Sequence, residues 1–139
     1  METISYAHRF AYGYAGASGR FPLLHPVLSN PNDPAMAVQV DAYLDSGAER
    51  SLFQGWIARD LGLDLLSGRA RSYSTTARTL LEARLHRVRL SQQDLGEFEL
   101  EIGFATGEIT RNLLGRDFFD LIQIGFRERH LTFYMTPTP

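Results

Sequence analysis

Apolar side chains occupy every second position over residues 36–44, and this alternation predicts a strand with one buried face. By the same parity the next residue, Asp45, leaves the buried row. Ser46 and Gly47 then break the strand, because glycine tolerates backbone angles that other residues avoid and serine hydrogen-bonds nearby backbone or a neighbouring carboxylate. The sequence therefore predicts a strand that runs directly into a carboxylate-bearing turn.

A short helix is predicted after this turn. Apolar residues recur at helical spacing between Leu52 and Leu61. Ser51 with Gln54 resembles a capping box at the helix start, and Gly62 is suited to the helix end. The predicted order is strand, Asp-Ser-Gly turn and helix.

Two further strands are predicted before this unit. Residues 4–14 are rich in aromatic residues and alanine with partial alternation, and residues 21–28 form a second apolar run. Two prolines in the second run favour an edge position, because proline cannot donate to a strand ladder. A glycine-containing loop separates the two runs, and residues 30–34 are typical of a turn.

The second half of the chain is also dominated by strands. Apolar positions in residues 81–85 and 88–90 differ in parity, which predicts a bulge or bend between them. Residues 98–104 alternate most clearly and carry an acidic outer face. Residues 113–119 combine an apolar run, a glycine and a short helical segment, and residues 122–135 predict an antiparallel hairpin. Many short strands with few helices indicate an all-β, barrel-like domain.

Composition narrows the function classes. The chain has 139 residues, of which 44% are hydrophobic and 22% charged, so one globular domain with a real core is expected. A formal charge of −2 with a pI near 6.1 provides no global case for nucleic-acid binding. The span 67–90 does carry six Arg against one acid, which is more typical of a solvated face than of a contact surface for nucleic acid or an acidic peptide.

The expected compartment is the cytoplasm, without a membrane partner. The absence of cysteine excludes a disulfide framework, a thiol nucleophile and Cys-ligated zinc, and it fits a reducing compartment. No apolar run approaches the roughly 20 residues of a membrane span, and the N-terminus lacks a signal-peptide pattern.

Common catalytic motifs do not occur. The four histidines are far apart in sequence, no metal-ligand spacing is present, and neither a G-x-S-x-G elbow nor a phosphate-binding Walker loop is found. We therefore expect no metal site and no cofactor. Asp45-Ser46-Gly47 alone is an equally weak signal, because this sequence also makes an ordinary turn.

Two motifs together resemble the retropepsin-like aspartic proteases in their bacterial single-domain form. Residues 44–48, Leu-Asp-Ser-Gly-Ala, are similar to the active-site motif of that family, and residues 112–119 are similar to its apolar-apolar-Gly-Arg-Asp segment. The resemblance implies a closed or partly open β-barrel with one or two short helices, the half-domain of the acid protease fold. It divides the chain into an N-terminal strand or extension over 1–20 and a protease domain over 21–139.

The resemblance also implies roles for the residues of the turn. Asp45 would be the catalytic carboxylate, and the Ser46 hydroxyl would tie two active-site loops together. Gly47 would line the substrate cleft, and Ala48 would complete the active-site loop.

Structural support and a flap are implied further along the chain. Arg116, after Gly115, would pair with Glu49 and brace the loop through a charge-assisted fork. The flap, a hairpin that closes over substrate, should fall within residues 69–85. The tip of the flap would contain Tyr73, Ser74, Thr75 and Thr76. It has no glycine, which departs from the family pattern.

The chemistry of this family implies a homodimer that acts on a peptide or protein substrate. Aspartic proteolysis uses two carboxylates that share a proton, and this chain has one Asp-Ser-Gly motif. A symmetric dimer would supply Asp45 twice. The alternative is a catalytically inactive module that binds peptides or partners with the same fold; the intact Asp45, Ser46 and Gly47 favour the enzyme, and the glycine-free flap favours the alternative.

Overall fold

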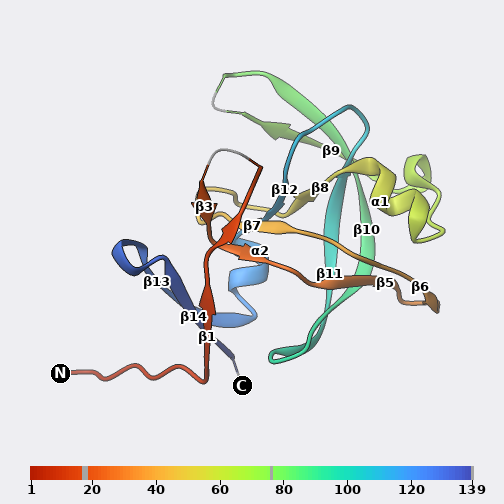
Figure 1. Ribbon diagram of the computed structural model, residues 1–139. Coiled ribbons are helices and arrows are strands. Elements are labelled where there is room, and N and C mark those ends of the chain that lie inside the picture. The colour runs from red at the N-terminus through yellow and green to blue at the C-terminus, as the bar shows by residue number, and fades with distance from the viewer. Residues whose placement is uncertain (17–18, 76, 139) are drawn as a thin grey trace.

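The computed structural model describes residues 1–16, 19–75 and 77–138, and these residues fold mainly into strands (Figure 1). The strands form sheets of nine, three and two members. The elements in chain order are β1 (His8–Ala11), β2 (Gly13–Tyr14), β3 (Arg20–Phe21), β4 (Leu23–Leu24), β5 (Val27–Asn30), β6 (Asp33–Gln39), β7 (Ala42–Leu44), β8 (Leu52–Phe53), α1 (Gly55–Asp60), η1 (Leu65–Ser67), β9 (Arg69–Ser74), β10 (Leu80–Gln92), β11 (Gly96–Ala105), β12 (Asn112–Leu114), α2 (Arg116–Phe119), β13 (Ile122–Arg127), η2 (Glu128–His130) and β14 (Thr132–Pro137).

The nine-stranded sheet brings distant parts of the chain together. Its order is β4-β7-β12-β8-β11-β10-β5-β6, and β9 pairs with β10 off this path. The late strand β12 thus lies between β7 and β8, parallel to β7 and antiparallel to β8. Because β7 and β12 are parallel and in register, the turns that follow them, at Asp45 and Gly115, begin side by side.

The alternation of residues 36–44 is confirmed in their burial, but the predicted single strand is divided into β6 and β7, with residues 40 and 41 between them. Val40, Ala42 and Leu44 are buried, whereas Gln39 and Asp41 are exposed. The strand of residues 98–104, the turn at 30–34 and the C-terminal hairpin are also confirmed, as β11, the β5–β6 connection and the β13–β14 pair. The main core lies between these strands and the two helices, and its largest fully buried side chains are Phe53, Phe104, Phe118 and Phe133.

The predicted helix start was wrong. Leu52–Phe53 is strand β8, and α1 begins at Gly55 after Gln54, whose side chain makes no capping hydrogen bond. The physical reason is that β8 lies between β11 and β12, so its backbone is used by the sheet before the helix can start. Gly62 does end the helix, with a φ of +73° that favours glycine.

The predicted bulge in residues 81–90 was also wrong. β10 pairs with β11 without a register shift from Ala83 to Gln92. Odd-numbered and even-numbered apolar residues of β10 are both buried because each face of the strand packs against an apolar cluster over part of its length. Val88 and Leu90 face the main core, while Ala83 faces a small second cluster with Leu52 and Ala105. One regular strand therefore serves two apolar clusters.

The N-terminal predictions hold in part. Residues 4–14 contain β1, which pairs with β14, and β2, which pairs with β3. The run 21–28 is interrupted at its prolines; β4 is an edge strand as expected, but β5 lies between β6 and β10. The glycine-containing loop includes residues 17–18, which lie outside the described residues. No helix among the described residues is long and apolar enough to cross a membrane.

Candidate active site

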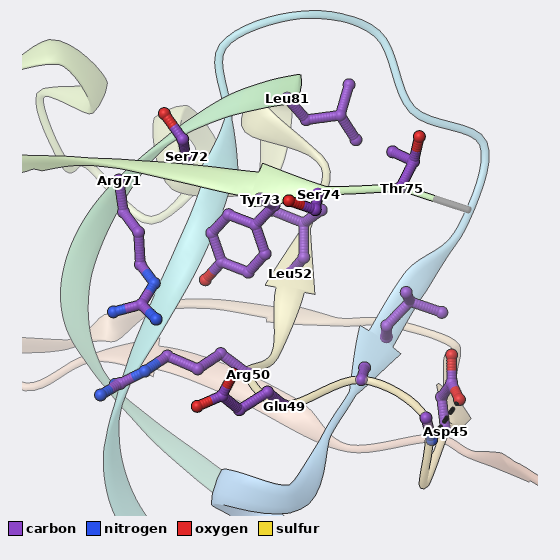
Figure 2. Close-up of a pocket in the computed structure, with 13 residues that line it drawn as sticks. Asp45, Glu49, Arg50, Leu52, Arg71, Ser72, Tyr73, Ser74, Thr75 and Leu81 are labelled. Carbon is purple, nitrogen blue, oxygen red and sulfur yellow. Dashed lines mark hydrogen bonds between the residues drawn. The ribbon is translucent and has the colours of Figure 1, made fainter. Parts of the chain in front are cut away.

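The Asp45 turn and the β9–β10 hairpin face each other across a pocket of about 550 Å³ (Figure 2). From the turn, Asp45, Gly47, Ala48 and Glu49 line it. The expected hairpin residues Tyr73, Ser74 and Thr75 line it from the other side, and Thr76 lies outside the described residues. Sequence reasoning did not identify six further lining residues: Arg50, Leu52, Arg71, Ser72, Leu81 and Leu113.

The Asp45 turn is closed by three hydrogen bonds. The Asp45 N–H donates to the Leu114 carbonyl at 2.9 Å, and the Ala48 N–H donates to the Asp45 carbonyl at 3.1 Å. The Gly47 N–H donates to Asp45 Oδ1 at 2.9 Å. Within the described residues Oδ2 accepts no hydrogen bond. The half-buried carboxylate is therefore held at the pocket with one oxygen available to a ligand.

Ser51 fixes the far end of the same loop. Its N–H donates to both carboxylate oxygens of Asp117 at 3.0 and 3.1 Å, and its hydroxyl donates to Asp117 Oδ1 at 2.7 Å. The Ser51 hydroxyl oxygen in turn accepts the Gly115 N–H at 3.0 Å. Ser51 is fully buried, so these partners satisfy polar groups that water does not reach. The residue predicted to cap a helix instead joins the two turns.

The backbone, and not an ion pair, connects Gly115 and Arg116 to the loop. The Arg116 N–H donates to the Ala48 carbonyl at 2.8 Å. A Cβ on Gly115 would overlap that same carbonyl, so this close approach requires glycine. The expected pairing of Arg116 with Glu49 is not seen: within the described chain no ion pair joins them, and both residues are exposed.

Asn112 adds a second polar connection, at the other end of β12. Its side-chain oxygen accepts the Gln54 N–H at 2.8 Å, and its amide donates to the Asp41 carbonyl at 3.1 Å. One side chain thereby joins the starts of α1, β7 and β12. Gly115 directly follows the other end of β12. The two hydrogen bonds of Asn112 therefore help to fix the strand that supports the Asp45 turn.

Tyr73 connects the hairpin to the loop. Its hydroxyl donates to the Ser51 carbonyl at 3.0 Å, and its ring lies where a Cβ on Gly103 would be. Burial raises the pKa of Tyr73 to about 12, although the nearby positive charge of Arg71 acts in the opposite direction. The tyrosine is therefore neutral at physiological pH and acts as a hydrogen-bond donor.

The other expected site residue, Ser46, is exposed and makes no hydrogen bond within the described residues. The structure thus brings Asp45, Gly47 and Ala48 together with the hairpin and leaves Ser46 at the surface. Among the described residues, no group of three or more His, Asp or Glu side chains could hold a metal ion.

This combination of fold and site defines a class of protein. A curled strand-built half-barrel carries an Asp-Ser-Gly turn beside a Gly-Arg-Asp turn, under a hairpin, which is the retropepsin-like fold. A family model described as aspartyl protease matches residues 32–118, more than half of the chain. The chain therefore belongs to the aspartyl protease family and is a retropepsin-like aspartic hydrolase.

Two solved structures share the fold. A retropepsin-like aspartic protease from Rickettsia conorii matches with a TM-score of 0.61 at 17% identity, covering 97% of this chain and 96% of that chain. The EIAV protease complexed with the inhibitor HBY-793 matches with a TM-score of 0.54 at 17% identity, covering 78% of this chain and 92% of that chain. No curated protein sequence matches the chain.

Proposed function

We propose that this protein is an aspartic endopeptidase that works as a homodimer, with Asp45 of each subunit forming the catalytic pair. The observation that carries the proposal is the Asp45 turn itself: its carboxylate, one oxygen of which accepts no hydrogen bond from the described residues, lies on a pocket opposite a hairpin. The pocket can hold an extended peptide between the turn and the hairpin, as β-strand recognition requires. The same assignment makes Gly47 and Ala48 the active-site loop and Tyr73, Ser74 and Thr75 part of the flap.

The chemistry requires a second carboxylate. One ionised Asp45 takes a proton from water as the water oxygen bonds to the scissile carbonyl carbon, and the protonated partner carboxyl donates to the carbonyl oxygen. When the tetrahedral intermediate collapses, the C–N bond breaks and the nitrogen takes up a proton. One chain contains one Asp-Ser-Gly motif, so the second carboxylate comes from another copy across a two-fold axis.

Ser46 supports this assembly. Its hydroxyl is exposed and, within the described chain, it has no hydrogen-bond partner, although it lies next to Asp45. In a symmetric dimer each Ser46 can hydrogen-bond the other subunit's loop and connect the two turns. No feature of the described structure favours the non-enzymatic peptide-binding module.

Substitution of Asp45 tests the proposal most directly. Asp45→Asn keeps the size and one acceptor oxygen but removes the ionisable group from both subunits, so peptide cleavage should fall by at least about 1,000-fold. Cleavage of a peptide library by wild type and Asp45→Asn is measured from acidic to neutral pH, where wild type should follow a bell-shaped profile. Cleavage by Asp45→Asn at the wild-type rate would show that another residue is catalytic.

Assembly is tested by dilution. If each active site uses two chains, activity per chain should rise with protein concentration until the dimer saturates. The rise is measured with one fixed peptide, while sedimentation reports the dimer fraction over the same range. Full specific activity in a sample that sediments only as a monomer would contradict the homodimer.

A further inference from the structure

Two arginines enter the pocket at the end away from Asp45. Arg50 comes from the loop between Asp45 and Ser51, and Arg71 comes from β9. Figure 2 shows both guanidinium groups on the same side of the pocket, with Asp45 on the opposite side. Both residues are half-buried, and within the described residues neither guanidinium makes a hydrogen bond or an ion pair.

Two other arginines of the same hairpin have carboxylate partners. Arg69 pairs with Glu101 at 3.0 Å, and Arg84 pairs with Glu82 at 3.1 Å while also donating to two backbone carbonyls. Arg71 lies between them on the chain and faces the pocket, where its guanidinium lies 5.9 Å from the centroid of the Tyr73 ring. Within the described residues Arg71 therefore forms no ion pair, whereas Arg69 and Arg84 each form one.

The carboxylates around the two arginines are engaged elsewhere or exposed. Asp117 accepts the hydrogen bonds of Ser51, and Glu101 pairs with Arg69. Glu49 lines the same pocket but is exposed and forms no ion pair in the described chain. Two half-buried positive charges at one end of the pocket repel each other, and this cost is offset when an anion binds between them.

The backbone that carries both arginines is held in place. Arg50 lies between Ala48, whose carbonyl accepts the Arg116 N–H, and Ser51, which is bound by Asp117. Arg71 precedes Tyr73, whose hydroxyl is bonded to the Ser51 carbonyl. Both side chains thus start from segments joined at Ser51, so the backbone needs little ordering when a ligand binds.

We propose that Arg50 and Arg71 form a subsite that binds an acidic side chain of the peptide substrate, at a position removed from the scissile bond. The proposal rests on the proposed peptidase function. A carboxylate is the partner that a guanidinium binds through two parallel hydrogen bonds, and a peptide extended from Asp45 along the pocket brings its side chains past both arginines. The protease is accordingly selective for substrates with Asp or Glu at one position.

Paired peptides test this selectivity. Each pair has the same sequence and an amidated C-terminus and differs by Glu against Gln at one position, which is scanned along the peptide on both sides of the cleaved bond. We expect wild type to show a kcat/KM about tenfold higher for the Glu peptide at one position, and a smaller ratio at high salt. In Arg50→Gln/Arg71→Gln the ratio should fall to about one.

Matched controls separate this inference from charge loss and from assembly. Arg59→Gln removes an exposed arginine of α1 outside the pocket and should keep the wild-type ratio. Arg50→Glu/Arg71→Glu should prefer a Lys peptide at the same position. Equal kcat/KM for Glu and Gln at every position, or an unchanged ratio in Arg50→Gln/Arg71→Gln, overturns the subsite while the peptidase stands.

Two outcomes identify other failures. If the double variant loses its dimer in sedimentation, the arginines serve assembly and the subsite proposal is rejected. If wild type cleaves no peptide of the set or of a random library, the proposed function fails. The subsite is then judged by calorimetric titration of Asp45→Asn with the Glu and Gln peptides, and equal affinity rejects it as well.

Discussion

The Asp45 loop and the tip of the β9–β10 hairpin form opposite walls of one pocket but are held very differently. The loop is bonded to β12, α2 and β9 through Leu114, Asp117 and Tyr73. At the tip, Thr75 and Thr79 bond to each other, and within the described residues no hydrogen bond joins residues 75–80 to another part of the molecule except that between β9 and β10. The loop is fixed by the whole fold, and the tip of the hairpin by its own strand pairing.

This difference fits the separate tasks of the two walls. A catalytic carboxylate must be held in one geometry, whereas a hairpin that covers a peptide has to open for the peptide to enter. Residues 77–80 at the tip are exposed, which makes local opening of the tip inexpensive. The tip forms its turn without glycine by placing Arg78 at a φ of 60°, in the left-handed region that most residues avoid.

The largest effect is expected when the hydrogen bonds between Ser51 of the loop and Asp117 are removed. Asp117→Ala leaves the buried Ser51 N–H and hydroxyl without their acceptor, so the free energy of unfolding should fall by about 3 kcal/mol and peptide cleavage should fall with it. Asp117→Asn keeps one acceptor oxygen and should cost less. Denaturant unfolding of the three proteins measures the difference, and equal stability of Asp117→Ala and wild type would refute the role given to Ser51.

A smaller effect is expected when the connection between the two walls is removed. Tyr73→Phe keeps the ring against Gly103 but loses the hydrogen bond to the Ser51 carbonyl, so stability should fall by about 1 kcal/mol. Amide exchange in β9 should become faster, while exchange at residues 45–51 should change little. Hydrogen exchange read by mass spectrometry tests this, and equal acceleration in both segments would mean that the walls do not open separately.

The last expected effect concerns the stability of wild type and Tyr73→Phe in alkaline solution. An unfolded tyrosine loses its proton near pH 10, whereas burial raises the pKa of Tyr73 to about 12. Between these values the unfolded state binds fewer protons, so stability falls as pH rises from 10 to 12. The pKa of Tyr12 is also raised to about 12, by burial and by its bond to Glu128. Tyr12 is present in wild type and in Tyr73→Phe, so it contributes equally to the pH dependence of their stability.

The stability gap between wild type and Tyr73→Phe should therefore narrow over this pH interval. Denaturant titrations at pH 9, 10, 11 and 12 measure the gap. A gap that stays constant to pH 12 would show that Tyr73 ionises as an ordinary exposed tyrosine.

Much of the fold was predictable because it depends on local patterns. Alternation identified β7 and β11, and the turn chemistry of Asp45-Ser46-Gly47 identified the end of β7. The two motifs identified the family because each encodes a turn whose shape depends on a few consecutive residues. The Asp-Ser-Gly turn beside a strand end and the Gly before α2 are determined in this way.

The tertiary structure alone decided what depends on residues far apart in the chain. Ser51 resembled a helix cap because Gln54 follows it, but Asp117, 66 positions later, takes its hydrogen bonds. The parity change in β10 predicted a bulge because nothing local reveals a second apolar cluster on the other face. Arg71 belonged to a span predicted to be a solvated face, and Arg50 lies outside every motif of the sequence, yet both line one pocket where Tyr73 joins β9 to the Ser51 carbonyl. Periodicity reports which face of a segment is buried, whereas pairing between distant segments determines what that face meets.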